Sequence, residues 1–264
     1  MDRQAPVGHL LRHWREQRRV SQLALALEAE VSSRHLSFVE NGRARPSRAL
    51  ILRPGELLDL PLRERNRMLL SGGFSPQFAE RDLSEPALTQ ARAAVCRLLD
   101  AHDPYPALAV DRHWNLLLSN AAARRLMQGV AAELLSPQPN VLRISLHPRG
   151  LAPAILNLGE WRRHLFNRLR RLIALTDDSG LAALYRELAD YPRLPGEDEP
   201  RADADDGADI MLPFRMRSPI GELSLFSTLT VFGTPTEITL SDLAIESFFP
   251  ADQDTAERLR QMAG

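Results

Sequence analysis

Residues 21–47 read SQLALALEAEVSSRHLSFVENGRARPS, and this stretch decides the fold of the N-terminal part of the chain. Ser21 and Ser32 each stand where an N-cap is expected, directly before apolar residues at helical spacing. Asn41 and Gly42 mark a helix end, because glycine readily adopts the left-handed conformation found there. Two short helices joined by so tight a turn are typical of a helix-turn-helix.

Apolar spacing predicts three more helices around this pair, over 7–18, from Ala49 to Leu58, and from Pro61 to the Gly72-Gly73 stop. Five short helices predict an all-α N-terminal domain over residues 1–75. A proline lies inside the fourth helix, at Pro54, where it removes one backbone hydrogen bond and its ring clashes with a carbonyl. We therefore expect that helix to be kinked or split there.

The basic residues are unevenly distributed along the chain. All 33 are arginine, 13 of them within residues 1–75 against 8 acidic residues, so this part carries a net charge of +5. The remainder carries −6, consistent with −1 for the whole chain of 264 residues. A basic N-terminal part on an acidic remainder favours binding of a polyanion by the first part alone.

Six separated groups of residues within 21–47 agree in register with a known pattern: Ser21-Gln22, Leu25-Ala26, Val31-Ser32, Leu36-Ser37, Glu40-Asn41-Gly42 and Arg45-Pro46-Ser47. Residues 7–73 therefore resemble the lambda-repressor-like XRE helix-turn-helix family. The chain departs from the family at Glu30, a turn position usually held by glycine. A left-handed conformation there costs on the order of 1 kcal/mol.

The resemblance assigns the DNA contacts to two groups of side chains. It implies that Gln22 and Asn41 meet phosphates at the two ends of the motif, with Arg43 and Arg45 beside them. It also implies that four residues face the major groove, where Arg can bind guanine bidentately and Phe can contact a thymine methyl group: Ser33, Arg34, Ser37 and Phe38.

Residues 76–86 have the composition of a linker, and residues 87–264 predict a second, α+β domain. We expect a helix over 87–102, strands at 107–110 and 114–119, and a helix over 120–128. Helices follow over most of 151–191, then an acidic loop at 196–209, strands at 210–217 and 222–232, and a helix over 255–262. Strands at both ends with helices between them indicate one antiparallel sheet.

Long phrases of this second part, including PYPALAVDRHWNLLLSNAAA at 104–123 and LSLFSTLTVFGTPTEITLSDLAIESFFP at 223–250, resemble the MmyB-like ligand-binding domain. The resemblance covers about residues 86–262. It implies a PAS-like fold whose sheet cups a small-molecule pocket, in one branch with a bound fatty acid, and it implies no catalysis.

A ligand pocket needs apolar walls and a few converging polar groups. The predicted walls are Trp161, Phe166, Leu169, Phe226, Leu229 and Phe232, which the resemblance places around one pocket. The predicted head-group contacts are His147, Arg162 and His164, because Arg and His can bind a carboxylate. We therefore expect a medium- to long-chain acid or a similar amphiphile, although these aromatic residues could instead simply fill the core.

The sequence argues against an enzyme. Without lysine there is no Schiff base, no phosphate-binding loop of the GKS type and no Ser-Lys dyad. His102, His113 and His164 have no metal-ligand spacing with one another or with Cys96, the single cysteine. We expect no catalytic residue, metal or cofactor, and no membrane span or secretion signal.

These observations predict a cytoplasmic transcription regulator that binds operator DNA as a homodimer and responds to a small-molecule effector. Two other interpretations stay open. The second domain could be a dimerisation scaffold that binds no ligand, or the chain could be a metabolic enzyme with an accessory helix-turn-helix.

Overall fold

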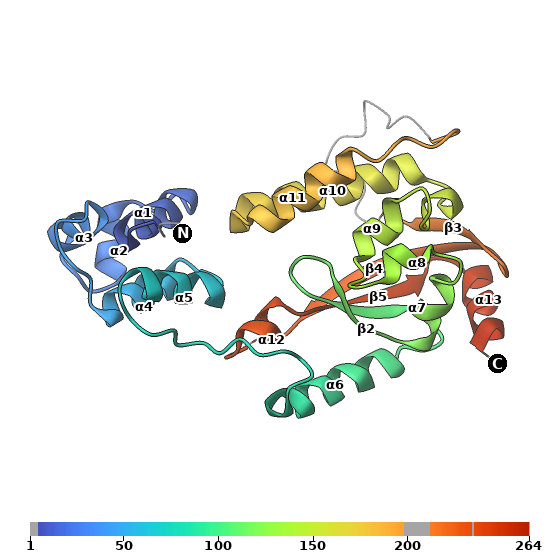
Figure 1. Cartoon of the computed structure of the whole chain (residues 1–264), viewed down its shortest axis with the longest axis horizontal. Helices are drawn as coiled ribbons and strands as arrows, with labels where there is room; N and C mark the ends of the chain where they lie inside the picture. The colour runs from blue at the N-terminus through green and yellow to red at the C-terminus, as the bar shows by residue number, and fades with distance from the viewer. Residues whose placement is uncertain (1–4, 198–211, 234, 264) are drawn as a thin grey trace. The chain divides into compact units, whose positions relative to one another are not determined.

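The computed structural model describes residues 5–197, 212–233 and 235–263 (Figure 1). Most of the predicted acidic loop at 196–209, and the first two residues of the predicted strand at 210–217, lie outside them. The chain forms two compact units. Among the described residues, the first unit comprises 5–81 together with 235–241, and the second comprises 82–233 and 242–263.

The first unit contains the five predicted helices, α1 (Val7–Gln17), α2 (Gln22–Glu28), α3 (Ser33–Glu40), α4 (Arg48–Leu57) and α5 (Leu62–Ser71). The predicted caps are present, since the Ser21 hydroxyl accepts a hydrogen bond from the backbone of Ala24 and the Ser32 hydroxyl accepts one from His35. Gly42 follows α3 with φ +69°. The prediction of an all-α helix-turn-helix region is confirmed.

The core of this unit comes from all five helices, and its most buried side chains include Leu11, Trp14, Leu25, Leu36 and Leu69. Burial of apolar surface at about 25 cal/mol per Å² is the main force that holds such short helices together.

The predictions for two irregular positions of the first unit, Glu30 and Pro54, had different outcomes. Glu30 adopts the left-handed conformation, with φ +59°, as predicted for the turn. The prediction that α4 is split at Pro54 is wrong, because one helix runs through it. Backbone bonds from Leu58 to Pro54 and from Leu60 to Gly55 continue past the proline. The buried side of α4, which includes Pro54 itself, keeps the helix packed despite the one lost bond.

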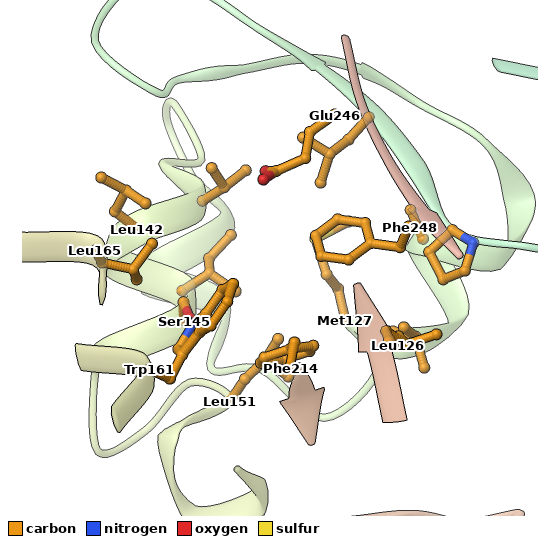
Figure 2. A pocket seen from close by; sticks show the side chains of 16 residues that line it. Leu126, Met127, Leu142, Ser145, Leu151, Trp161, Leu165, Phe214, Glu246 and Phe248 are labelled. Atoms are coloured by element: carbon orange, nitrogen blue, oxygen red, sulfur yellow. Dashed lines mark hydrogen bonds between the residues drawn. The ribbon is translucent and has the colours of Figure 1, made fainter. Parts of the chain in front are cut away.

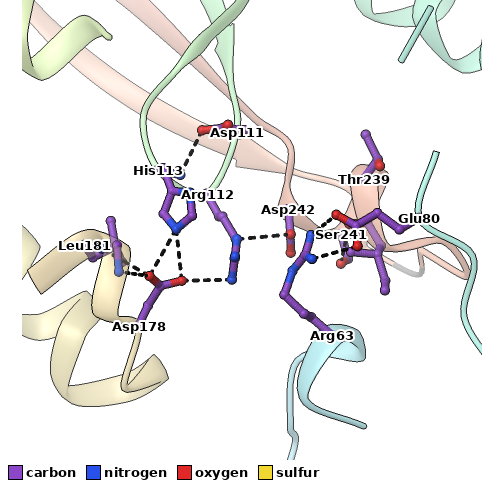
Figure 3. A network of polar contacts seen from close by, with 12 residues as sticks. Arg63, Glu80, Asp111, Arg112, His113, Asp178, Leu181, Thr239, Ser241 and Asp242 are labelled. Atoms are coloured by element: carbon purple, nitrogen blue, oxygen red, sulfur yellow. Dashed lines mark hydrogen bonds and ion pairs between the residues drawn. The ribbon is translucent and has the colours of Figure 1, made fainter. Parts of the chain in front are cut away.

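The residues after α5 are fixed by a single buried amide side chain. Asn66 Oδ1 accepts hydrogen bonds from the backbone nitrogens of Gln77 and Phe78, at 2.9 and 3.1 Å. Asn66 Nδ2 donates to the carbonyl of Phe78 at 2.7 Å. Arg63, also on α5, pairs with Glu80, with contacts of 2.5 and 2.7 Å (Figure 3). Together these contacts hold the linker against α5.

Residues 237–241 belong to the first unit although they lie far along the sequence. The backbone nitrogen of Arg81 donates to Glu237 Oε1 at 2.8 Å, and that of Ile238 donates to the carbonyl of Ala79, also at 2.8 Å. The Thr239 hydroxyl donates to the carbonyl of Arg81. The short helix α12 (Ile238–Asp242) is therefore bound to the linker.

The second unit is an α+β domain, as predicted. Its sheet is antiparallel, with strand order β2-β1-β5-β4-β3, and its strands are β1 (Ala107–Val110), β2 (Leu116–Ser119), β3 (Phe214–Ser218), β4 (Gly221–Val231) and β5 (Ala244–Pro250). Four of the strands were predicted. The fifth, β5, was not, although it lies in the middle of the sheet.

Helices cover this sheet and connect its two halves: α6 (Thr89–Asp100), α7 (Ala121–Leu126), α8 (Ala132–Leu135), α9 (Val141–Leu146), α10 (Leu158–Thr176), α11 (Ser179–Ala189) and α13 (Gln253–Ala263), with two 3-10 turns at Pro86–Leu88 and Ala152–Ala154. All four residues of β1 are buried, so both faces of the sheet are covered there. One core joins α9, α10 and α11 to the inner residues of β1, β3 and β4.

We predict that Asn66→Ala loosens the linker. The substitution removes all three hydrogen bonds to residues 77 and 78 and leaves partly buried backbone groups unpaired, at a cost of about 1–3 kcal/mol in the free energy of unfolding. Urea unfolding and limited proteolysis near residues 75–81 measure the effect. Asn66→Asp keeps the acceptor but replaces the donor with a negatively charged oxygen beside the Phe78 carbonyl, so it should also lose stability. Unchanged stability and unchanged cleavage in Asn66→Ala would contradict the assignment.

Candidate DNA interface and ligand cavity

The predicted DNA-reading residues lie on α3 and just after it. Ser33 and Arg34 are exposed at its N-terminal end, while Ser37 and Phe38 are half-buried one turn later. The guanidinium of Arg34 lies 5.3 Å from the centre of the Phe38 ring. A recognition helix contacts base edges with its N-terminal residues, so the exposed end of α3 has the required form.

The residues predicted to contact phosphates differ in their exposure to solvent. Asn41, Arg43 and Arg45 are exposed beyond the end of α3. The Asn41 amide donates to the carbonyl of Ser37 at 2.8 Å. Gln22 is half-buried at the start of α2, and its amide nitrogen donates to Glu40 Oε2 at 3.0 Å. The role of these side chains at phosphates stays a prediction.

A buried ion pair that the sequence did not reveal fixes the position of α3. Arg15 on α1 donates to both carboxylate oxygens of Glu40 on α3, at 2.8 and 2.9 Å. Arg15 also donates to the carbonyl of Val20 at 3.0 Å, and the Glu40 side chain is only 2% exposed. The hydrogen bonds that Arg15 donates to Glu40 raise the pKa of the Arg15 guanidinium. Together with Gln22, this pair ties α1, α2 and α3 to one carboxylate.

The second unit contains an apolar cavity of about 80 Å³ between the sheet and helices α7, α9 and α10 (Figure 2). That volume holds on the order of five water molecules, at roughly 10–15 Å³ each. The residues around it are Pro106, Leu108, Ala123, Leu126, Met127, Val141, Leu142, Ile144, Ser145, Leu151, Trp161, Leu165, Phe214, Leu225, Glu246 and Phe248.

Two polar groups stand among these apolar side chains. The Trp161 indole nitrogen donates to the Ser145 hydroxyl at 2.9 Å, which joins α10 to α9. Glu246, on β5, accepts hydrogen bonds at Oε1 from Arg168 at 3.2 Å and from the Ser227 hydroxyl at 3.0 Å. The guanidinium of Arg168 in turn lies 4.2 Å from the centre of the Trp114 ring. The cavity therefore contains one carboxylate.

Of the predicted head-group residues, none lines this cavity. Arg162 is buried and forms an ion pair with Glu197, with contacts of 2.8 and 3.3 Å. His164 is exposed and stacks on Trp161, with ring centres 5.4 Å apart. His147 accepts a hydrogen bond from the backbone of Arg149 at 3.0 Å.

Of the predicted walls, the structure brings only Trp161 to the cavity. Phe166 packs edge-on against Tyr185, and Phe226 stacks on Phe249. Leu169 lies in the core and Phe232 is half-buried, whereas Leu229 is 45% exposed. The cavity is instead formed by residues that sequence reasoning missed, most of them on α7, α9, β3 and β5. The only sequence signal for them was the length of the resemblance, which spans all four elements.

In the part of the chain that the structure describes, no group of three or more His, Cys, Asp or Glu residues could hold a metal ion. Within the same ranges, no helix has both the length and the apolar character needed to cross a membrane.

Comparison with known proteins agrees with this geometry. Residues 91–262 match the family described as MmyB-like transcription regulator ligand binding domain, and residues 6–68 match a helix-turn-helix domain. The first match covers more than half of the chain, so the protein belongs to the MmyB-like family of transcription regulators. Its domain content is that of a DNA-binding regulator with a ligand-binding domain.

Other comparisons add little. The search of curated proteins returned no significant match. Among solved structures, a chain described as an RNA-binding Light-Oxygen-Voltage Receptor is similar at 13% identity and a TM-score of 0.27. That match covers 97% of this chain but 62% of the receptor chain, so this protein spans less than two thirds of the receptor's length.

We predict different effects for two arginines near α3. If Arg34 reads a base edge, as the resemblance implies, Arg34→Ala should weaken binding to a cognate operator by about 1–3 kcal/mol and relax the preference at one base pair. If Arg43 meets a phosphate, Arg43→Ala should weaken binding to all sequences alike and flatten the salt dependence. Fluorescence anisotropy on operator and scrambled DNA at several salt concentrations separates them. Full operator affinity in Arg34→Ala would show that α3 does not read the bases through this residue.

Proposed function

We propose that the protein is a cytoplasmic, ligand-responsive transcription regulator, which binds operator DNA as a homodimer and a small amphiphile in the cavity of its second unit. One helix-turn-helix buries little surface on DNA, and such proteins usually bind two half-sites about 10 base pairs apart. Two copies of the exposed α3 end would supply the two half-site contacts. The cytoplasm is where such a protein meets its operator.

The lining of the cavity supports an amphiphile. Its walls are almost wholly aliphatic or aromatic, with a carboxylate and a hydroxyl as the polar exceptions. An apolar ligand body gains about 0.8 kcal/mol for each methylene group that it buries. The volume of about 80 Å³ favours a medium chain, and a longer chain requires side chains such as Met127 and Phe248 to move. The lining and the volume concern the apolar part of the ligand, and a fatty-acid-like effector stays a prediction.

The observation that carries the proposal is the place of residues 237–241. They bond to linker residues 79–81 within the first unit, and β5 starts at Ala244, directly after α12. β5 carries Glu246 and Phe248, which line the cavity. A ligand that moves β5 therefore acts on a segment that is hydrogen-bonded to the linker. Such a link is what coupling between a ligand site and a DNA-binding helix bundle requires.

Two measurements test the function. Organic extraction of the purified protein followed by mass spectrometry identifies a bound amphiphile. Selection of DNA from a random pool then yields an operator, whose affinity is measured with and without that ligand. We expect a two-fold symmetric operator and a coupling of about 1–3 kcal/mol, that is, 5- to 150-fold in affinity. Equal operator affinity in both conditions would make the second domain a scaffold rather than a sensor.

We predict that Glu237→Ala uncouples operator binding from ligand binding. Glu237 accepts hydrogen bonds from the backbone of Arg81 and of Leu240, and both are lost in the variant. Operator binding and ligand binding should each persist, while the effect of ligand on operator affinity falls below about twofold. Glu257→Ala, which changes an exposed glutamate on α13, is the matched control and should keep the full effect.

If Glu237→Ala retains the coupling of the parent, residues 237–241 do not transmit the signal. Glu237→Gln, which keeps one carbonyl acceptor, serves as the second variant if the alanine protein fails to bind the ligand. It should show a reduced coupling.

A further inference from the structure

We propose that Glu246 makes the cavity selective for amphiphiles whose polar end donates a hydrogen bond, that is, an aliphatic alcohol or amine rather than a carboxylic acid. This inference rests on the proposed function, since it assumes that the cavity is the effector site. It replaces the carboxylate head predicted from the sequence.

The position of Glu246 is fixed by its strand. It lies in the middle strand of the sheet, where its backbone pairs with Leu108 of β1 and with Leu229 of β4. The residue is 6% exposed, and its carboxylate points into the cavity from β5 (Figure 2). A glutamate this deeply buried is rare in proteins unless it is paired or binds a ligand.

The hydrogen bonds of Glu246 leave one oxygen for a ligand. Arg168 and the Ser227 hydroxyl both donate to Oε1. Within the described ranges, no group of the protein donates a hydrogen bond to Oε2. A carboxylate has acceptor capacity on both oxygens, so Oε2 keeps the capacity to accept a hydrogen bond from a ligand, on a side chain that lines the cavity.

The lining of the cavity offers no cation to an acid head group. Glu246 is the one ionisable side chain among the lining residues, and Arg168 is not among them. The Ser145 hydroxyl accepts the hydrogen bond of the Trp161 indole, and its own O–H is a neutral donor that cannot balance a ligand's charge. Arg162, the nearest arginine in the sequence to Trp161, is occupied by Glu197. A ligand carboxylate would therefore find no cation among the lining residues and would lie beside the Glu246 carboxylate, whose charge Arg168 offsets at Oε1.

These contacts predict that ligands with different head groups bind the cavity with different affinity. Two carboxylates in a site of low dielectric repel each other, so an acid head group should bind less tightly beside Glu246 than a neutral or cationic one. A hydroxyl or ammonium group instead donates to Oε2, and hydrogen bonds with an ionised partner are about twice as strong as neutral ones. The alcohol and the amine share this donor chemistry and differ in charge.

Calorimetry on the full-length protein at neutral pH tests the inference with three ligands of equal chain length: octanol, octylamine and octanoate. We expect octanol and octylamine to bind about tenfold more tightly than octanoate. In Glu246→Gln, octylamine should lose about tenfold and octanoate should gain, while octanol changes little because the amide oxygen still accepts. Glu222→Gln, on an exposed residue of β4, is the control and should preserve the order of the parent.

The outcomes separate this inference from the proposed function. If octanoate binds most tightly to the parent, or if Glu246→Gln leaves the order unchanged, the selectivity is wrong while the cavity remains an amphiphile site. If none of the three ligands binds, the effector site itself is overturned. Because Glu246→Gln leaves Arg168 without its ion-pair partner, a second variant removes both charges, Arg168→Gln with Glu246→Gln. It should also lose the preference for octylamine.

Discussion

The pairing of β5 with β1 on one side and β4 on the other is the constraint on which the second unit depends. Ala244 to Ser247 pair with β1, and the whole strand from Ala244 to Pro250 pairs with β4. Since side chains alternate along a strand, this register places Glu246 and Phe248 on the same face, where both line the cavity. The strand also starts directly after α12, whose residues bond to the linker. One strand therefore joins the cavity wall to the segment that reaches the helix-turn-helix unit.

The helix-turn-helix could be predicted because its signals are local. Ser21, Ser32 and Ser47 cap their helices within three residues, and Gly42 ends α3. The Glu40 network could not be predicted in the same way, because its partners Arg15 and Gln22 lie 25 and 18 residues away in the sequence. From sequence alone, a charged residue is predicted to lie on the surface unless its ion-pair partner is known. Removing one partner of such a buried pair costs about 3–5 kcal/mol, so this carboxylate is central to the placement of α3.

The cavity was predicted less well, for two physical reasons. Residues 244–250 read AIESFFP, and an inward-facing glutamate breaks the alternation that marks a half-buried strand, so β5 was missed. The apolar walls were assigned to one pocket because the resemblance implies it, and Arg162 and His164 were added because they lie near Trp161 in sequence and can bind a carboxylate. Successive residues on a helix point about 100° apart, however, so Trp161 faces the cavity while Arg162 turns toward Glu197. Proximity in sequence was the wrong guide, and the tertiary fold decided which side chains met.

Hydrogen exchange tests most directly whether occupation of the cavity reaches the DNA-binding unit through β5. The amides to follow are those of Arg81 and Ile238, which donate to Glu237 and to Ala79. Their exchange rates report how often this contact opens. We expect octanol binding to change the exchange of both amides by severalfold, together with the amides of β5. If exchange changes only at the strands and helices around the cavity, and Arg81 and Ile238 exchange as in the free protein, the cavity is not connected to the linker in this way.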